Sequence, residues 1–68
     1  MKNYKSPFLE GGESVHNYKG RGFVVDYYRA SWQCSDSQHI VRGRGSTKQE
    51  AVREAHYYWD EYIKRNQL

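Results

Sequence analysis

Alternating apolar and polar positions mark the middle of the chain as β-structure. Residues 23–28 are rich in β-branched and aromatic side chains that repeat with a period of two, which predicts a strand. Past Arg29 the apolar phase reverses, which either a bulge or a break into two strands explains. The composition of residues 35–38 predicts a turn, and residues 39–42 then return as another strand.

The last third of the chain has the period of an amphipathic helix. A helix is predicted from about Thr47 to Arg65, and either Ser46 with Gln49 or Thr47 with Glu50 has the spacing of a capping box at its start. The apolar positions that recur at helical spacing are Ala51, Val52, Ala55, Tyr58, Trp59, Tyr62 and Ile63.

These elements predict an α+β fold, a small antiparallel sheet of two to three strands with one C-terminal helix packed on one face. The small residues Ala51 and Ala55 allow the start of the helix to approach the sheet closely. Residues 1–14 show neither period and contain a proline and two glycines, so we expect a flexible N-terminal arm. Residues 15–68 then form a single β-β-β-α domain, with a short first strand ending near Tyr18.

Size and composition place the chain among small intracellular domains. Its 68 residues suffice for one domain, whose core must come from seven tyrosines, two tryptophans and two phenylalanines. A homodimer that covers some of these aromatic side chains is a further expectation. The single cysteine, Cys34, allows no internal disulfide and is expected to be a small buried hydrophobe. Without a signal-like or membrane-length apolar run, a cytoplasmic location is expected.

Catalytic and metal-binding patterns are not apparent in the sequence. The three histidines are His16, His39 and His56, and one cysteine with one histidine does not make a zinc site. The Gly-Arg-Gly units at 20–22 and 43–45 lack the spacing of nucleotide-binding loops. We therefore expect no enzyme activity, no catalytic residue, no metal and no cofactor.

The charge distribution favours a polyanion as partner. The net charge is +3, and residues 1–48 hold eight lysines and arginines against four acids. Residues 49–68 hold three lysines and arginines against four acids, so the basic excess precedes the helix. This asymmetry is typical of a nucleic-acid-binding face, although surplus lysines that serve solubility alone give the same total.

The junction between the last strand and the helix carries the candidate binding residues. Arg42 and Arg44 precede the helix and Lys48 lies in its first turn, where unpaired backbone N–H groups attract phosphate. The residues expected to extend the contact are Lys19, Arg21, Tyr28 and Arg29.

Residues 43–55, Gly-Arg-Gly-Ser-Thr-Lys-Gln-Glu-Ala-Val-Arg-Glu-Ala, resemble the C-terminal half of double-stranded-RNA-binding domains. That family follows its last strand with a G-x-G-x-S turn and a Lys-Lys-x-Ala-Lys helix start, whose lysines contact phosphates. Lys48 matches the first lysine, whereas Gln49 and Val52 replace the other two. The same outline is similar to the arm-type DNA-binding domains of integrases, which insert a sheet face into the major groove, and to HicB-like antitoxins and small phage inhibitor proteins.

Two functions follow as hypotheses. The first is a small non-enzymatic nucleic-acid-binding protein that contacts duplex phosphates, DNA or RNA, through the basic strand-to-helix junction. The alternative is a small phage-type or regulatory protein that binds and inhibits a protein partner through its exposed sheet, with Tyr27, Tyr28 and Trp32 as anchors. No membrane partner is expected.

Overall fold

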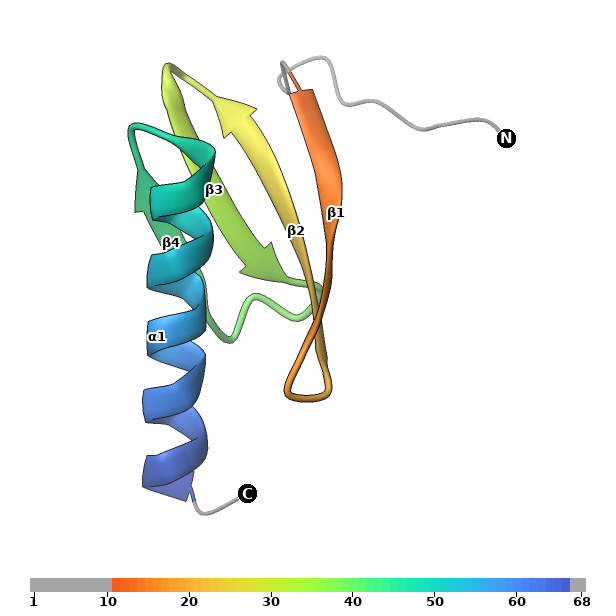
Figure 1. Ribbon diagram of the computed structural model, residues 1–68, viewed down its shortest axis with the longest axis vertical. Coiled ribbons are helices and arrows are strands. Elements are labelled where there is room, and N and C mark those ends of the chain that lie inside the picture. The colour runs from red at the N-terminus through yellow and green to blue at the C-terminus, as the bar shows by residue number, and fades with distance from the viewer. Residues whose placement is uncertain (1–10, 67–68) are drawn as a thin grey trace, which may run out of the picture.

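The computed structural model describes residues 11–66, with side chains from Val15 onward (Figure 1). Its elements are β1 (Gly11–Tyr18), β2 (Arg21–Tyr28), β3 (Ser31–Asp36), β4 (Arg42–Gly45) and α1 (Lys48–Asn66). The strands form one antiparallel sheet in the order β1-β2-β3-β4. The α+β class with one C-terminal helix is confirmed, but the sheet has four strands, and the expectation of two to three was wrong.

The first strand is longer than the sequence pattern predicts. It begins at Gly11, so residues 11–14 belong to the sheet although they were expected in the arm. Backbone pairing with β2, from Gly11 opposite Tyr27 to Val15 opposite Phe23, holds this segment in the sheet. The sequence does not predict it, because the two glycines have no side chains and so break the alternation of apolar and polar residues. Residues 1–10 of the predicted arm lie outside the described residues.

Two tight turns connect the first three strands. Lys19 and Gly20 have φ values of 52° and 82°, and Arg29 and Ala30 have φ values of 54° and 64°. Two-residue turns with positive φ at both positions match the right-handed twist of hairpin strands. The phase reversal near Arg29 is therefore a break into two strands and not a bulge.

The fourth strand lies later in the chain than expected. It spans Arg42–Gly45 rather than 39–42, and β3 continues through Asp36 into the segment expected to be a turn. The buried Asp36 organises the loop that follows, because its carboxylate Oδ1 accepts a hydrogen bond from the Ile40 N–H at 2.8 Å and its carbonyl oxygen accepts one from the His39 N–H at 3.0 Å. The chain is thereby held in a loop before it re-enters the sheet.

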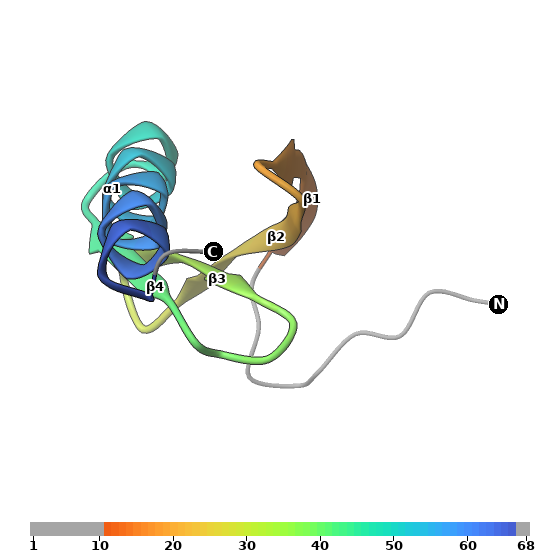
Figure 2. The same ribbon diagram turned by 90° about the horizontal axis from the view of Figure 1, so that it is seen from below.

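The helix α1 covers one face of β3 and β4, and the sheet curves so that β1 rises on the same side as α1 (Figure 2). Ala51 and Ala55 are fully buried where α1 meets β4, as their size predicts. Gly43 of β4 lies directly beneath them. Small residues on both elements therefore set a short distance between helix and strand.

The core lies between α1 and the covered face of the sheet. Its buried apolar residues are Phe23, Val25, Cys34, Val41, Ala51, Ala55 and Trp59. Cys34 is 0% exposed, which confirms it as a buried hydrophobe. Within the predicted apolar stripe, Ala51, Ala55 and Trp59 are buried, and Val52, Tyr62 and Ile63 are half-buried against the core. Tyr58 was expected in the same stripe but is 46% exposed.

Candidate nucleic-acid interface

The helix leaves one face of the sheet uncovered, and we call this the bare face. By strand alternation its described members are Val24, Asp26, Tyr28, Ser31, Gln33, Ser35, Arg42 and Arg44, of which Ser35 is buried at 8% exposure. They alternate along the strands with residues such as Phe23, which are buried under α1. The strand register places Gln33 beside Arg44 and Ser35 beside Arg42. Two of the predicted binding residues therefore share one surface with polar neighbours.

The two arginines lie on the edge strand of this face, and both are exposed. Across the strands, Arg44 of β4 pairs with Gln33 of β3, and Gln33 pairs in turn with Asp26 of β2. Asp26 is therefore the nearest described acid in this row of paired residues. Two strand spacings amount to about 10 Å. An amide side chain thus separates the Asp26 carboxylate from the guanidinium groups. At the outer edge of β4, however, the Glu54 carboxylate lies beside the Arg44 backbone.

Tyr28 and Arg29 lie at the end of the sheet where β2 turns into β3. The Arg29 Nε donates a hydrogen bond to the Tyr28 hydroxyl oxygen at 3.1 Å, and its guanidinium carbon lies 5.3 Å from the ring centroid. Tyr28 pairs with Ser31, two residues before Gln33 on β3. This pair therefore extends the bare face at the end nearest Arg44.

Lys48 lies on the other side of the sheet. Its Nζ is 5.7 Å from the ring centroid of Trp32, whose side chain points toward the helix-covered face because it shares that face with Cys34. The structure therefore does not bring Lys48 onto the surface that Arg42 and Arg44 share.

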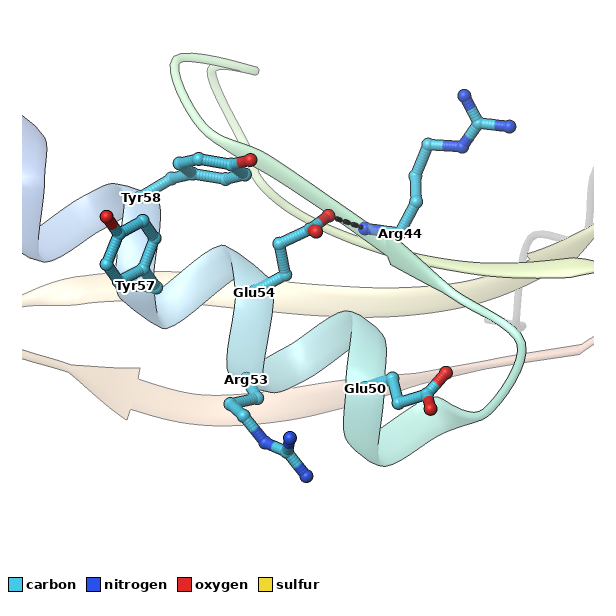
Figure 3. A pocket seen from close by; sticks show the side chains of 6 residues that line it. All are labelled: Arg44, Glu50, Arg53, Glu54, Tyr57 and Tyr58. Carbon is cyan, nitrogen blue, oxygen red and sulfur yellow. Dashed lines mark hydrogen bonds between the residues drawn. The ribbon is translucent and has the colours of Figure 1, made fainter.

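The start of α1 is capped by the chain's own groups. Thr47 Oγ1 accepts a hydrogen bond from the Glu50 N–H at 3.1 Å, and Glu50 Oε1 accepts bonds from the N–H and the hydroxyl of Ser46, both at 3.0 Å. These bonds hold the pKa of the Glu50 carboxyl below its usual value. Glu54 Oε1 accepts a bond from the Arg44 N–H at 2.7 Å (Figure 3). The carboxylates of Glu50 and Glu54 thus accept hydrogen bonds from the backbone N–H groups of Ser46 and Arg44, at the junction that was expected to hold phosphate. Figure 3 shows the Arg44 side chain extending away from α1.

Lys19 is engaged at the opposite end of the sheet. Its Nζ lies 2.8 Å from Asp60 Oδ1, and the Tyr18 hydroxyl donates to Asp60 Oδ2 at 3.0 Å. The hydrogen bond with Asp60 raises the pKa of Lys19, and the same bond is the largest cause that lowers the pKa of Asp60. Lys19 therefore ties the β1–β2 turn to the second half of α1.

Arg21 is half-buried and pairs with a buried acid. Its Nε lies 3.3 Å from Oδ2 of Asp36, a carboxylate that is 0% exposed, and its Nη1 donates to Gln38 Oε1 at 3.1 Å. Its guanidinium carbon also lies 4.9 Å from the ring centroid of Trp59. Arg21 thereby neutralises a buried charge and packs on the core.

The three aromatic anchors of the alternative hypothesis do not share a surface. Tyr27 and Trp32 pair across β2 and β3 on the helix-covered face, with ring centroids 5.0 Å apart. Tyr28 points to the bare face, since adjacent residues of a strand point to opposite faces. A partner on the exposed sheet would contact only Tyr28 of this set.

Cys34 and His56, two of the residues considered for catalysis, are packed within the fold. Burial, with a smaller contribution from Asp26, raises the pKa of the Cys34 thiol to about 11, so it is protonated at neutral pH. His56 stacks on Tyr18 with ring centroids 3.9 Å apart, and burial lowers its pKa. Within the described part of the chain, no three His, Cys, Asp or Glu residues lie close enough together to hold a metal ion.

Sequence reasoning grouped the basic residues by their proximity along the chain and missed Gln33 and Ser35. A signal for these two was present in the period of β3, where Cys34 separates them and faces the helix, although Ser35 is itself buried. The sequence alone gave neither the strand boundaries nor the face of the sheet on which the helix packs, so this signal could not be assigned to a surface.

Among residues 11–66, no helix has the length and apolar character needed to cross a lipid bilayer. Comparison of the chain with protein-family models, with curated proteins and with solved structures finds no match.

Proposed function

We propose that this protein is a non-enzymatic nucleic-acid-binding protein whose contact surface is the bare face of its sheet. The observation that carries the proposal is the placement of Arg42 and Arg44, two exposed cations two positions apart on one edge strand, on a face left uncovered by the helix. Cations in such positions neutralise phosphates and release counterions, which supplies most of the affinity for a duplex.

The neighbours of the two arginines support a duplex as the ligand. The half-buried Gln33 adds an amide that is able to pair with an adenine edge. Ser35, beside Arg42, is only 8% exposed and adds no contact surface. Tyr28 and Arg29 supply an aromatic ring and a third guanidinium at the end of the same face. Strands are known to enter nucleic-acid grooves with such faces. Lys48, Lys19 and Arg21 are outside this proposed contact surface, because each is engaged on the helix side of the molecule.

Fluorescence anisotropy with labelled duplex DNA and duplex RNA of equal sequence, over a series of salt concentrations, tests the proposal. We expect Arg42→Gln and Arg44→Gln each to weaken binding and to lower the slope of log K against log salt by about 1. The double variant is expected to lose about twice that slope.

Lys64→Gln is the matched control, because it removes the same charge from a side chain in the last turn of α1 that is 78% exposed. Arg65, in the same turn, is unsuitable because it borders a hollow that Arg42 also lines. If Lys64→Gln reduces the affinity as much as Arg42→Gln does, the binding follows net charge and not the bare face. If neither duplex binds at low salt, the proposal is wrong and a protein partner on the exposed sheet becomes the leading hypothesis.

A further inference from the structure

The side of α1 that faces away from the sheet carries charges in an order that inverts about the middle of the helix. Tyr57 is the central residue of Lys48–Asn66. The outward residues, which we call the outer stripe, are Glu50, Arg53, Tyr57, Glu61 and Lys64. Their spacings of three, four, four and three place them on one side of a helix, opposite the buried row of Ala51, Ala55 and Trp59.

The outer stripe is accessible along its length. Tyr57 is 58% exposed, and the side chains of Lys64 and Glu61 are 78% and 36% exposed. Glu50 and Arg53 are also exposed, and Figure 3 shows both projecting from the first half of α1. Within the stripe, Lys64 and Glu61 form a loose pair at 3.8 Å, which is worth little on an exposed surface, and Arg53 attracts the Glu50 carboxylate. Oε1 of Glu50 also accepts two hydrogen bonds from Ser46 at the start of the helix.

A second copy of the chain is related to the first by a rotation of 180° about an axis that passes beside Tyr57 at right angles to α1. This rotation sets the two helices face to face and antiparallel. In that arrangement Glu50 lies opposite the partner's Lys64, and Arg53 lies opposite the partner's Glu61. Tyr57 meets the partner's Tyr57 on the axis. Every charge of the stripe then faces its opposite, and each pair occurs twice, as a two-fold contact requires. The antiparallel helix dipoles add to the complementarity.

The centre of this surface has the apolar character of an interface. Tyr58 is 46% exposed and its ring meets the Tyr57 ring edge to face at 5.4 Å between centroids. These tyrosines, with Arg44, Glu50, Arg53 and Glu54, line an open hollow of about 550 Å³. Tyrosine is favoured at the centre of contact surfaces and charges at their rim. The carboxylates in the hollow disfavour a polyanion here, so the charge pattern fits a protein and not a nucleic acid.

We propose that the outer stripe of α1 binds a second copy of this chain, with the two helices antiparallel and Tyr57 on the two-fold axis. Of the bare-face residues only Arg44 borders this contact, through the hollow that it lines with the two tyrosines. The proposal does not rest on nucleic-acid binding.

Sedimentation equilibrium from about 5 µM to about 1 mM protein tests the proposal, and a dimer is expected within this range. Arg53→Glu alone and Glu61→Arg alone each set like charges opposite one another at two symmetry-related places. Each is expected to raise the dissociation constant at least about tenfold. An equimolar mixture of the two variants is expected to recover the dimer, because each then supplies the charge that the other lacks.

Arg29→Glu, at the exposed β2–β3 turn, is the matched charge reversal and is expected to dimerise like the parent protein. Circular dichroism verifies that each variant remains folded, and recovery in the mixture itself requires folded chains. A parent protein that stays monomeric throughout, single variants that dimerise as well as the parent, or a mixture no better than its components would each overturn the proposal.

Discussion

A Cβ atom on Gly43 would overlap the backbone nitrogen of Ala55, so strand β4 and helix α1 touch where neither has room for a larger residue. The same atom would also overlap the carbonyl oxygen of Ala51. Backbone atoms of a helix do not rotate aside as a side chain does. The close approach of α1 to the sheet, which leaves the opposite face bare, therefore depends on this glycine.

Replacing Gly43 with alanine is expected to destabilise the fold by about 3 kcal/mol or more, because the added methyl group must push the helix away from the sheet. Urea unfolding monitored by circular dichroism measures the effect. Gly22→Ala is the control, since its Cβ would approach only the Asn17 side-chain oxygen at 3.2 Å. Similar midpoints for the two variants would show that the helix does not pack on Gly43 as described.

Replacing Ala30 with glycine is expected to stabilise the protein. Ala30 has a φ of 64°, a left-handed conformation that costs an alanine roughly 1 kcal/mol and a glycine almost nothing. Part of this gain is offset by the greater freedom of glycine in the unfolded chain, so we expect about 0.5 kcal/mol net. Thermal and urea unfolding report the change. A lower midpoint for Ala30→Gly would contradict the turn geometry.

Replacing Arg21 with alanine is expected to cost stability rather than to affect only nucleic-acid affinity. The substitution leaves the fully buried carboxylate of Asp36 without its cation. Removing one partner of a buried ion pair lowers the free energy of unfolding by about 3 kcal/mol. Arg42→Ala, at an exposed position, is expected to stay within about 0.5 kcal/mol of the parent. Urea unfolding of both variants distinguishes the two roles, and equal stabilities would assign Arg21 to the surface.

The stability of the fold is expected to fall as the pH drops below about 6.5, in part through His56. Burial lowers the pKa of His56 in the folded state, and Asp60 opposes the shift only partly. Between the unfolded value of 6.5 and the lower folded value, the unfolded chain therefore binds a proton that the folded chain does not.

His56→Phe keeps an aromatic ring against Tyr18 and removes the titrating group. We expect it to flatten the dependence of the unfolding free energy on pH between about pH 7.5 and about pH 5.5. An unchanged slope in His56→Phe would contradict the assignment.

Local patterns in the sequence were sufficient to predict the elements that have a clear period of apolar residues. The alternation of residues 23–28 predicted β2, and Thr47 with Ala51 and Ala55 predicted the start and the packed side of α1. Glycine misled the prediction twice. Gly11 and Gly12 were assigned to the arm, although β1 begins at Gly11. The last predicted strand ended at Arg42, although Gly43 and Gly45 are strand residues whose missing side chains leave room for the helix.

The candidate site was predicted only in part, because it depends on pairings between distant segments. Arg42 and Arg44 lie together on the bare face, as their position in one short segment suggested. Arg21 was grouped with them because nothing local reveals that Asp36, fifteen residues later, is the carboxylate beside it. Gln33 joined the surface only through the register of β3 with β4.

The most direct test of the proposed interface is an amide NMR titration of isotope-labelled protein with a short duplex DNA, repeated with duplex RNA, at about 50 mM and about 300 mM salt. We predict shifts centred on β3 and β4, at Gln33, Arg42 and Arg44, that vanish at the higher salt concentration. Shifts centred on the outer side of α1, or no shifts with either duplex at low salt, would contradict the bare face as a nucleic-acid-binding surface.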